Sequence, residues 1–172
     1  MSSEKVGFAG SSQGLLVGVL ERPDHAPLQA LAVFAHCFTC GKNSLAATRI
    51  SRALAQQGIA TLRFDFTGLG ESEGDFGRGG FSSSVADIVA AVHWMQSTIG
   101  MPALLVGHSL GGNAACIYAG IRPERIARLV NLEGLGLRRH HPDEAPERYA
   151  NWLDQLRDTP TFRSYPDRKA FA

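Results

Sequence analysis

The chain has 172 residues, of which 44% are hydrophobic, and this is enough to bury the core of one domain. Its 17 basic and 16 acidic side chains leave a formal net charge of +1, which gives no electrostatic case for binding nucleic acid or an anionic membrane surface. We find neither an apolar signal core after Met1 nor a run of ~18 apolar residues. Three cysteines, an odd number, favour a reducing compartment over a disulfide framework. We therefore expect a soluble cytoplasmic protein.

Apolar segments with two different periods predict both strands and helices. Two β-like segments flank the turn at residues 10–14 and indicate an N-terminal hairpin. The strands that we expect cover residues 6–9, 15–20, 31–35, 59–64, 103–106 and 126–132. The helices that we expect run from a cap at Asn43 to Gln57, from a cap within 82–84 to Met95, over 113–121, and over 144–156 in a polar tail, 142–172. This alternation predicts a single α/β domain over residues 1–172, with a mostly parallel sheet of about six strands and helices on both faces.

The pentapeptide Gly107-His108-Ser109-Leu110-Gly111 carries the clearest chemical signal. It joins a predicted strand to a predicted helix, and Gly-x-Ser-x-Gly at such a turn is typical of a nucleophile elbow, which lifts a strained serine clear of the sheet. The free N–H groups at the start of the following helix then face the place where negative charge develops during acyl transfer. We therefore predict that Ser109 attacks an ester-like carbonyl, with the amide of Leu110 as the nearest oxyanion donor.

Two further motifs accompany the pentapeptide. His36-Cys37-Phe38 follows the third expected strand, and Asp65-Phe66-Thr67-Gly68-Leu69-Gly70-Glu71-Ser72 follows the fourth. Together the three motifs resemble those of the α/β-hydrolase superfamily over nearly the whole chain. The resemblance implies an α/β-hydrolase fold, no metal or organic cofactor, and the amide of Phe38 as the second oxyanion donor. Cys37 stands where the family usually has glycine, so Cys37 and Phe38 both stay candidates for that N–H.

The two halves of the chain resemble different branches of the superfamily. Residues 30–95, which include 36–42, resemble the hydrolase half of bacterial fusions that carry an OsmC-type domain. Residues 108–156 resemble the carbon–carbon hydrolases and esterases. These resemblances suggest a chimera joined near Gly100, a hypothesis that separate searches with each half can test.

The resemblance supplies no catalytic histidine at the family's usual place. In the superfamily the chain order is nucleophile, acid, histidine, and this chain ends soon after its sixth expected strand, as a truncated form would. Because a serine needs a base to become a good nucleophile, we favour His140 and His141, in the loop after that strand. His36 is the alternative, although in the family this position braces the oxyanion loop, and a site without a base stays open. The side chain of His108 is expected to point away from the Ser109 hydroxyl.

Glu133 follows the sixth expected strand and is our candidate for the acid that orients the histidine. The resemblance implies this role, because members similar to haloalkane dehalogenases can place their acid there. A pairing of the same carboxylate with Arg138 or Arg139 in a surface loop explains it equally well.

The sixth expected strand, residues 126–132, is apolar but would lie at the edge of the sheet. Such an edge invites pairing with another chain. Two copies could join these edges and exchange residues 142–172, so that each site borrows groups from the other copy. We therefore expect a homodimer.

Cys37-Phe38-Thr39-Cys40 has the Cys-x-x-Cys spacing of thiol oxidoreductases, and Cys37 could also serve as an alternative nucleophile. The surrounding pattern is that of a hydrolase rather than of an oxidoreductase. Zinc binding by the two cysteines and His36 lacks a fourth ligand at a sensible spacing, so we expect no metal site.

The sequence thus predicts a small serine esterase for short-chain or activated esters. Ser109 would be the nucleophile, Glu133 the acid, and His141 or His140 the base, which the second copy of a dimer could supply. The alternative is a catalytically silent hydrolase-fold module that dimerises and binds an acyl ligand without turning it over. Fluorophosphonate labelling distinguishes the two.

Overall fold

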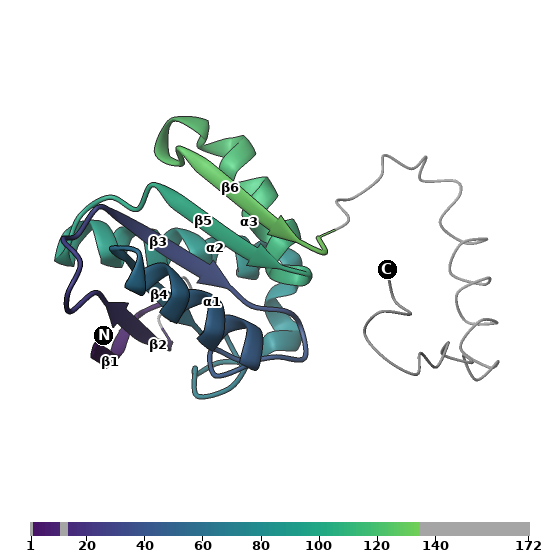
Figure 1. Ribbon diagram of the computed structural model, residues 1–172. Helices are drawn as coiled ribbons and strands as arrows, with labels where there is room; N and C mark the ends of the chain where they lie inside the picture. The colour runs from purple at the N-terminus through teal and green to yellow at the C-terminus, as the bar shows by residue number, and fades with distance from the viewer. Residues whose placement is uncertain (1, 11–13, 135–172) are drawn as a thin grey trace, which may run out of the picture. The chain divides into compact units, whose positions relative to one another are not determined.

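A computed structural model of the chain describes residues 2–10 and 14–134 (Figure 1). The predicted tail at 142–172, its helix at 144–156, and both favoured histidines, His140 and His141, lie outside the described residues. The same holds for Arg138 and Arg139, the alternative partners of Glu133.

The described strands form one six-stranded sheet in the order β1-β2-β4-β3-β5-β6. β1 pairs with β2, and β2 with β4, in antiparallel register, whereas β3, β4, β5 and β6 run parallel to one another. The strands are β1 Ser2–Ala9, β2 Leu15–Arg22, β3 Ala30–Ala35, β4 Ile59–Phe64, β5 Leu104–His108 and β6 Arg128–Leu132. The hairpin and the mostly parallel sheet are as the sequence predicts.

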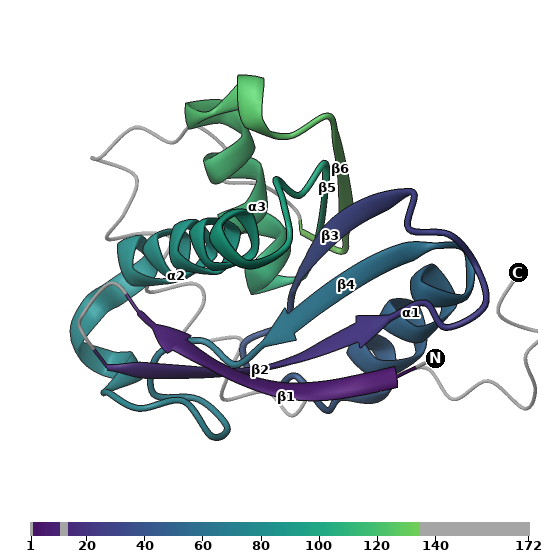
Figure 2. The same cartoon turned by 90° about the vertical axis from the view of Figure 1, so that its left-hand side faces the viewer.

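Helices cover both faces of the sheet, which confirms the predicted layering (Figures 1 and 2). The helices are α1 Leu45–Gln56, α2 Phe76–Thr98 and α3 Leu110–Ile121, followed by a short 3-10 turn, Pro123–Arg125. α2 and α3 pack on one face over the larger apolar cluster, which includes Leu105, Ile88 and Tyr118. α1 packs on the other face over a smaller cluster around Phe34 and Val106. β3 and β4 are buried along almost their whole length because both of their faces are covered.

The three described helices all begin at residues other than the predicted ones, and α3 begins at Leu110, three residues before the predicted start at Asn113. The N-cap of α1 is Ser44, whose hydroxyl accepts a hydrogen bond from the amide of Ala47 at 3.3 Å. The predicted cap, Asn43, instead accepts a hydrogen bond from the guanidinium of Arg63 at 2.8 Å.

α2 begins at Phe76, before the cap predicted within residues 82–84. The glycine-rich stretch there indicated a loop, because glycine is a weak helix former. In the structure the Phe76 ring packs edge to face on Phe38, with ring centroids 5.0 Å apart, and this tertiary contact accompanies the earlier start. No helix in the described ranges combines the length and the apolar character needed to cross a bilayer.

β6 forms one edge of the sheet in the described part of the chain. It begins at Arg128, two residues after the predicted start, and the buried Ile126 instead ends the 3-10 turn. Its apolar side chains Leu129 and Val130 are 37% and 41% exposed. The edge that motivated the expectation of a dimer is therefore present, and the dimer itself stays a prediction.

Candidate active site

Ser109 occupies the sharp turn between β5 and α3. Its backbone angles, φ 53° and ψ −113°, lie in a region that residues other than glycine rarely adopt. The Ser109 amide donates to the carbonyl of Leu132 in β6 at 2.8 Å, and the Ser109 carbonyl accepts from the amide of Asn113 at 3.0 Å. The strained conformation is thus held from both sides, as an elbow for a nucleophile requires.

The glycines around Ser109 are needed because backbones approach one another too closely for a side chain. A Cβ on Gly107 would lie 2.5 Å from the carbonyl oxygen of Gly111. A Cβ on Gly111 would lie 2.2 Å from the carbonyl oxygen of Ala35 in β3. Both distances are far below van der Waals contact, so the first turn of α3 can sit against β3 and β5 only with glycine at these positions.

The loop after β3 lies beside the first turn of α3. The amide of Gly111 donates to the carbonyl of His36 at 3.2 Å and joins the two segments directly. Leu110 is the first residue of α3, so its N–H has no acceptor within the helix. Phe38 lies in the turn that the hydrogen bond from the Cys40 amide to the Cys37 carbonyl closes at 3.1 Å. The structure therefore brings the segments of both predicted oxyanion donors together at the carboxyl ends of β3 and β5.

His36 braces this loop. Its side chain is buried, its Nδ1 lies 2.7 Å from the carbonyl oxygen of Cys37, and its Nε2 accepts from the amide of Phe66 at 3.4 Å. Burial lowers the pKa of His36, against the opposing effect of the Cys37 hydrogen bond. A neutral ring that donates from Nδ1 fits both contacts. Because one ring nitrogen is engaged by the loop after β3 and the other by the loop after β4, the geometry disfavours His36 as the catalytic base.

A buried ion pair fixes the loop that follows β4. The Asp65 carboxylate accepts from the Lys42 amide and from the Lys42 ammonium, each at 2.6 Å, and from the Glu71 amide at 3.0 Å. Lys42 also donates to the Glu71 carboxylate, which Lys5 approaches at 2.8 Å. Burial acts to lower the pKa of Lys42, but the two carboxylates outweigh it and hold that pKa raised. We name Asp65, Lys42 and Glu71 the Asp65 cluster; the sequence analysis gave Lys42 no role.

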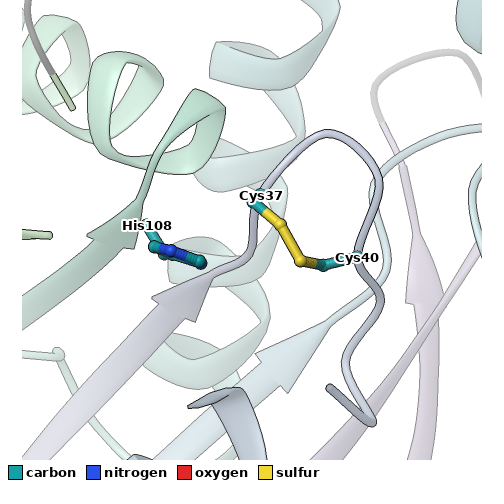
Figure 3. Close-up of side chains that lie close together, drawn as sticks. All are labelled: Cys37, Cys40 and His108. Carbon is teal, nitrogen blue, oxygen red and sulfur yellow. A yellow bond between two sulfur atoms is a disulfide. The ribbon is translucent and has the colours of Figure 1, made fainter. Parts of the chain in front are cut away.

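Cys37 and Cys40 form a disulfide, contrary to the expectation of free thiols (Figure 3). The turn brings their Cα atoms to 5.1 Å, within the usual range for a bond. Among the described cysteines, Cys116 has a free thiol. In this state Cys37 is not available as an alternative nucleophile, and the argument for a reducing compartment loses its basis.

His108 lies beside the disulfide, with a ligand atom within 4.8 Å of both sulfurs (Figure 3). Its Nε2 is 3.3 Å from the Glu133 carboxylate, and its Nδ1 is buried without a hydrogen-bond partner in the described structure. Glu133 has a φ of 60° and a side chain that is 81% exposed. Within the described residues its carboxylate therefore contacts His108, and its predicted role as an orienting acid stays a prediction.

Comparison with known families gives one match that spans most of the chain. The family described as serine aminopeptidase, S33, matches residues 27–161. This single match crosses the region of Gly100, so it gives no support to a join between two branches.

Individual relatives are longer than this chain. A curated Escherichia coli protein, described as an uncharacterized 31.7 kDa protein in the traX-finO intergenic region, is 34% identical over 104 residues, which are 59% of this chain and 36% of the relative. The esterase domain of a Rhodothermus marinus protein is 46% identical, with a TM-score of 0.56 over 72% of this chain and 47% of that one. Est1E from Butyrivibrio proteoclasticus, solved with ferulic acid, is 24% identical, with a TM-score of 0.66 over 72% of this chain and 51% of that one. The chain thus spans about a third to a half of these relatives, and the structural likeness confirms the predicted α/β-hydrolase fold.

Proposed function

We propose that this chain, which belongs to the serine aminopeptidase (S33) family, acts as a serine esterase on small or activated carboxylic esters. The observation that carries the proposal is the conformation of Ser109, with φ 53° at a strand-to-helix turn. Such a conformation costs roughly 1–3 kcal/mol and is found most often at active sites, where the strain is part of the mechanism. The turn presents the hydroxyl beside a helix N-terminus, where a developing oxyanion is stabilised.

In the proposed reaction the Ser109 hydroxyl attacks the ester carbonyl while a histidine accepts its proton. The amides of Leu110 and Phe38 hold the oxyanion, the alcohol leaves with the proton, and water then hydrolyses the acyl-serine in the same manner. His141 or His140 is the proposed base, and Glu133 orients it. This assignment rests on the position of Glu133 at the end of β6, next in the sheet to the strand that carries Ser109.

We favour an ester over a peptide as the substrate because the esterase domain of a Rhodothermus marinus protein is 46% identical to this chain. Est1E, which binds ferulic acid, has the same fold, and a small aromatic acyl group is therefore a sensible first test of substrate preference.

A homodimer through β6 remains part of the proposal. The edge of β6 carries Leu129 and Val130 with more than a third of each exposed, and pairing would cover them. Sedimentation at micromolar concentration tests this directly. A folded monomer would remove the dimer and the histidine donated by a second copy.

A catalytically silent module is the second candidate, and one observation favours it. In the described structure the His36 ring nitrogens contact Cys37, Phe66 and Asp65. The His108 ring contacts Glu133, and neither histidine has a described hydrogen bond to Ser109. Such a protein would fold and bind an acyl group without turning it over.

Intact-mass labelling with a fluorophosphonate, together with p-nitrophenyl acetate turnover, separates the two candidates. We expect one label on the wild type, none on Ser109→Ala, and saturable turnover that the same substitution abolishes. Ser82→Ala, an exposed serine on α2, is the matched control and should label like the wild type. A wild type that takes no label and is no faster than Ser109→Ala would overturn the esterase and leave the silent module.

A further inference from the structure

We propose that Cys37, Cys40 and His108 bind one zinc ion, or another divalent ion that prefers thiolate and imidazole ligands, when the disulfide is reduced. The three side chains come from two segments far apart in the sequence, the loop after β3 and the end of β5 (Figure 3). Their ligand atoms all lie within 4.8 Å of one another. The site shares Glu133 and the turn that carries the Phe38 amide with the proposed esterase machinery, but zinc binding is measured without reference to ester hydrolysis.

The spacing and the turn suit a metal as well as a disulfide. Cys-x-x-Cys is a typical spacing for a pair of zinc thiolates. Zinc lies about 2.3 Å from sulfur and about 2.0 Å from nitrogen, so its tetrahedral ligands are roughly 3.3–3.8 Å apart. Reduction lets the two sulfurs separate to that distance, while the hydrogen bond from the Cys40 amide to the Cys37 carbonyl keeps the turn closed. A modest movement of the side chains therefore completes the three ligands.

His108 is better prepared for a metal than the sequence indicated. Its Nε2 contacts the Glu133 carboxylate at 3.3 Å, which leaves Nδ1 as the free donor, and this atom is buried without a hydrogen-bond partner in the described residues. A metal-bound histidine usually donates its other N–H to a carboxylate, which orients the ring and raises its basicity. Glu133 already holds that position. The sequence analysis considered His36 instead, whose nitrogens are engaged by Cys37 and Phe66.

The reaction balances with a phosphine as the reductant. The disulfide, the phosphine and one water give two thiols and a phosphine oxide, and zinc then displaces one proton from each thiol. Each sulfur holds either its partner sulfur or the metal, so the two states exclude each other. Water fills the fourth position, as in other sites with three protein ligands.

The test compares the oxidised and phosphine-reduced protein, each desalted under nitrogen and titrated with zinc. Native mass spectrometry should show about one zinc per reduced chain, as a single three-ligand site requires, and none on the oxidised chain. Cobalt in place of zinc should give thiolate-to-metal charge-transfer bands in the reduced protein only. Because both arms use the wild-type sequence, misfolding of a variant cannot produce the difference.

Variants then assign the ligands. We expect Cys40→Ser and His108→Gln to weaken zinc binding at least about 100-fold, and Glu133→Gln about 10–100-fold through the orienting contact. Cys116→Ser and His25→Gln, which remove a thiol and an exposed imidazole elsewhere, are the matched controls and should bind like the wild type. Zinc binding by the oxidised chain, no binding by the reduced chain, or equal binding by His108→Gln would overturn the proposal.

Discussion

The turn at Ser109 and the Asp65 cluster lie at the carboxyl ends of two parallel strands, β5 and β4. Both depend on glycine, but for different reasons. At the Ser109 turn, Gly107 and Gly111 let one backbone approach another, and this leaves the serine hydroxyl raised above the sheet. At the Asp65 cluster, Gly70 makes room for the carboxylate itself, because a Cβ there would lie 2.2 Å from an Asp65 oxygen.

The two regions differ in their effect on stability: the Ser109 turn is strained, whereas the Asp65 cluster stabilises the fold. The Ser109 turn holds a residue in an unfavourable backbone conformation, which other interactions must sustain. In the Asp65 cluster, by contrast, each Asp65 oxygen accepts at least one hydrogen bond from a neighbouring segment. We therefore expect substitutions in the cluster to affect folding first, and conservative substitutions of Ser109 to affect chemistry alone.

The largest effect on stability should come from Asp65→Asn. Lys42 and Asp65 are 3% and 1% exposed, so the substitution leaves a buried ammonium with a weaker partner and costs about 3–5 kcal/mol in the free energy of unfolding. Urea denaturation measures it. The double variant Lys42→Met/Asp65→Asn is the control and should be more stable than Asp65→Asn alone, because no buried charge is left unpaired. A single variant within about 1 kcal/mol of the wild type would contradict the central role of the cluster.

Gly111→Ala should cost about 3 kcal/mol, since its Cβ would overlap the carbonyls of both Ala35 and His36 in a rigid backbone crossing. Gly120→Ala is the matched control on the same helix. Among the described residues, no atom beyond its chain neighbours and its own helix backbone lies within 4 Å of a Cβ built there, and alanine should stabilise the protein by about 0.5–1 kcal/mol. Thermal and urea unfolding of the pair should thus give changes of opposite sign. Equal changes in the free energy of unfolding would show that α3 packs less tightly on the Ala35 and His36 carbonyls than the structure indicates.

Ser72→Ala tests how the N-terminal hairpin supports the Asp65 loop. The Ser72 hydroxyl donates to the Asp65 carbonyl at 2.6 Å and accepts from the Val17 amide at 2.9 Å. Its loss leaves a buried N–H unpaired, which should cost about 2 kcal/mol in urea unfolding. The exposed Ser82→Ala should change the free energy of unfolding by less than about 0.5 kcal/mol. If both variants behave alike, the hydroxyl is not a structural link.

The smallest effect should be a dependence on acid at Glu71. Hydrogen bonds from Lys42 first, and then from Lys5, lower the pKa of Glu71 from 4.5 to about 2. A carboxyl with a depressed pKa stabilises the folded state above its unfolded pKa, so this contribution is present above pH 4.5 and is lost as the pH falls towards 2. Urea midpoints should fall across this window in the wild type and fall less steeply in Glu71→Gln. Parallel curves would contradict the assignment.

The sequence predicted the fold better than the beginnings of its helices. A continuous apolar run marked β3, because a strand covered on both faces needs no alternation, whereas β4 also buries the polar Thr61 and Arg63. The start of α2 was missed because the composition of its first turn favours a loop, and the contact between Phe76 and Phe38 could not be read from local pattern. Asn43 and Ser44 are equally good caps in isolation, and the choice depends on Arg63, which is twenty residues away.

In the candidate site, too, the local features were predicted from the sequence and the features that depend on tertiary contacts were not. The pentapeptide around Ser109 is a local signal, and the structure has the strained turn that it predicts. The group formed by Cys37, Cys40 and His108 depends on two strands being neighbours, which the sequence does not state. One signal was available: alternation along β5 places His108 on the same face as Val106, which α1 covers, and the loop with the cysteines leads into α1. Its contact with the cysteines could have been suspected from that face.

The hydrogen bond from the Gly111 amide to the His36 carbonyl has a consequence for protein engineering. It fastens the loop after β3 to the first turn of α3, and the absence of a side chain at position 111 is the condition for that attachment. A designer who transplants residues 36–44 into another hydrolase must therefore carry over the glycine and its helix turn as well. The two pieces are inherited as one exchangeable part, although more than sixty positions of sequence separate them.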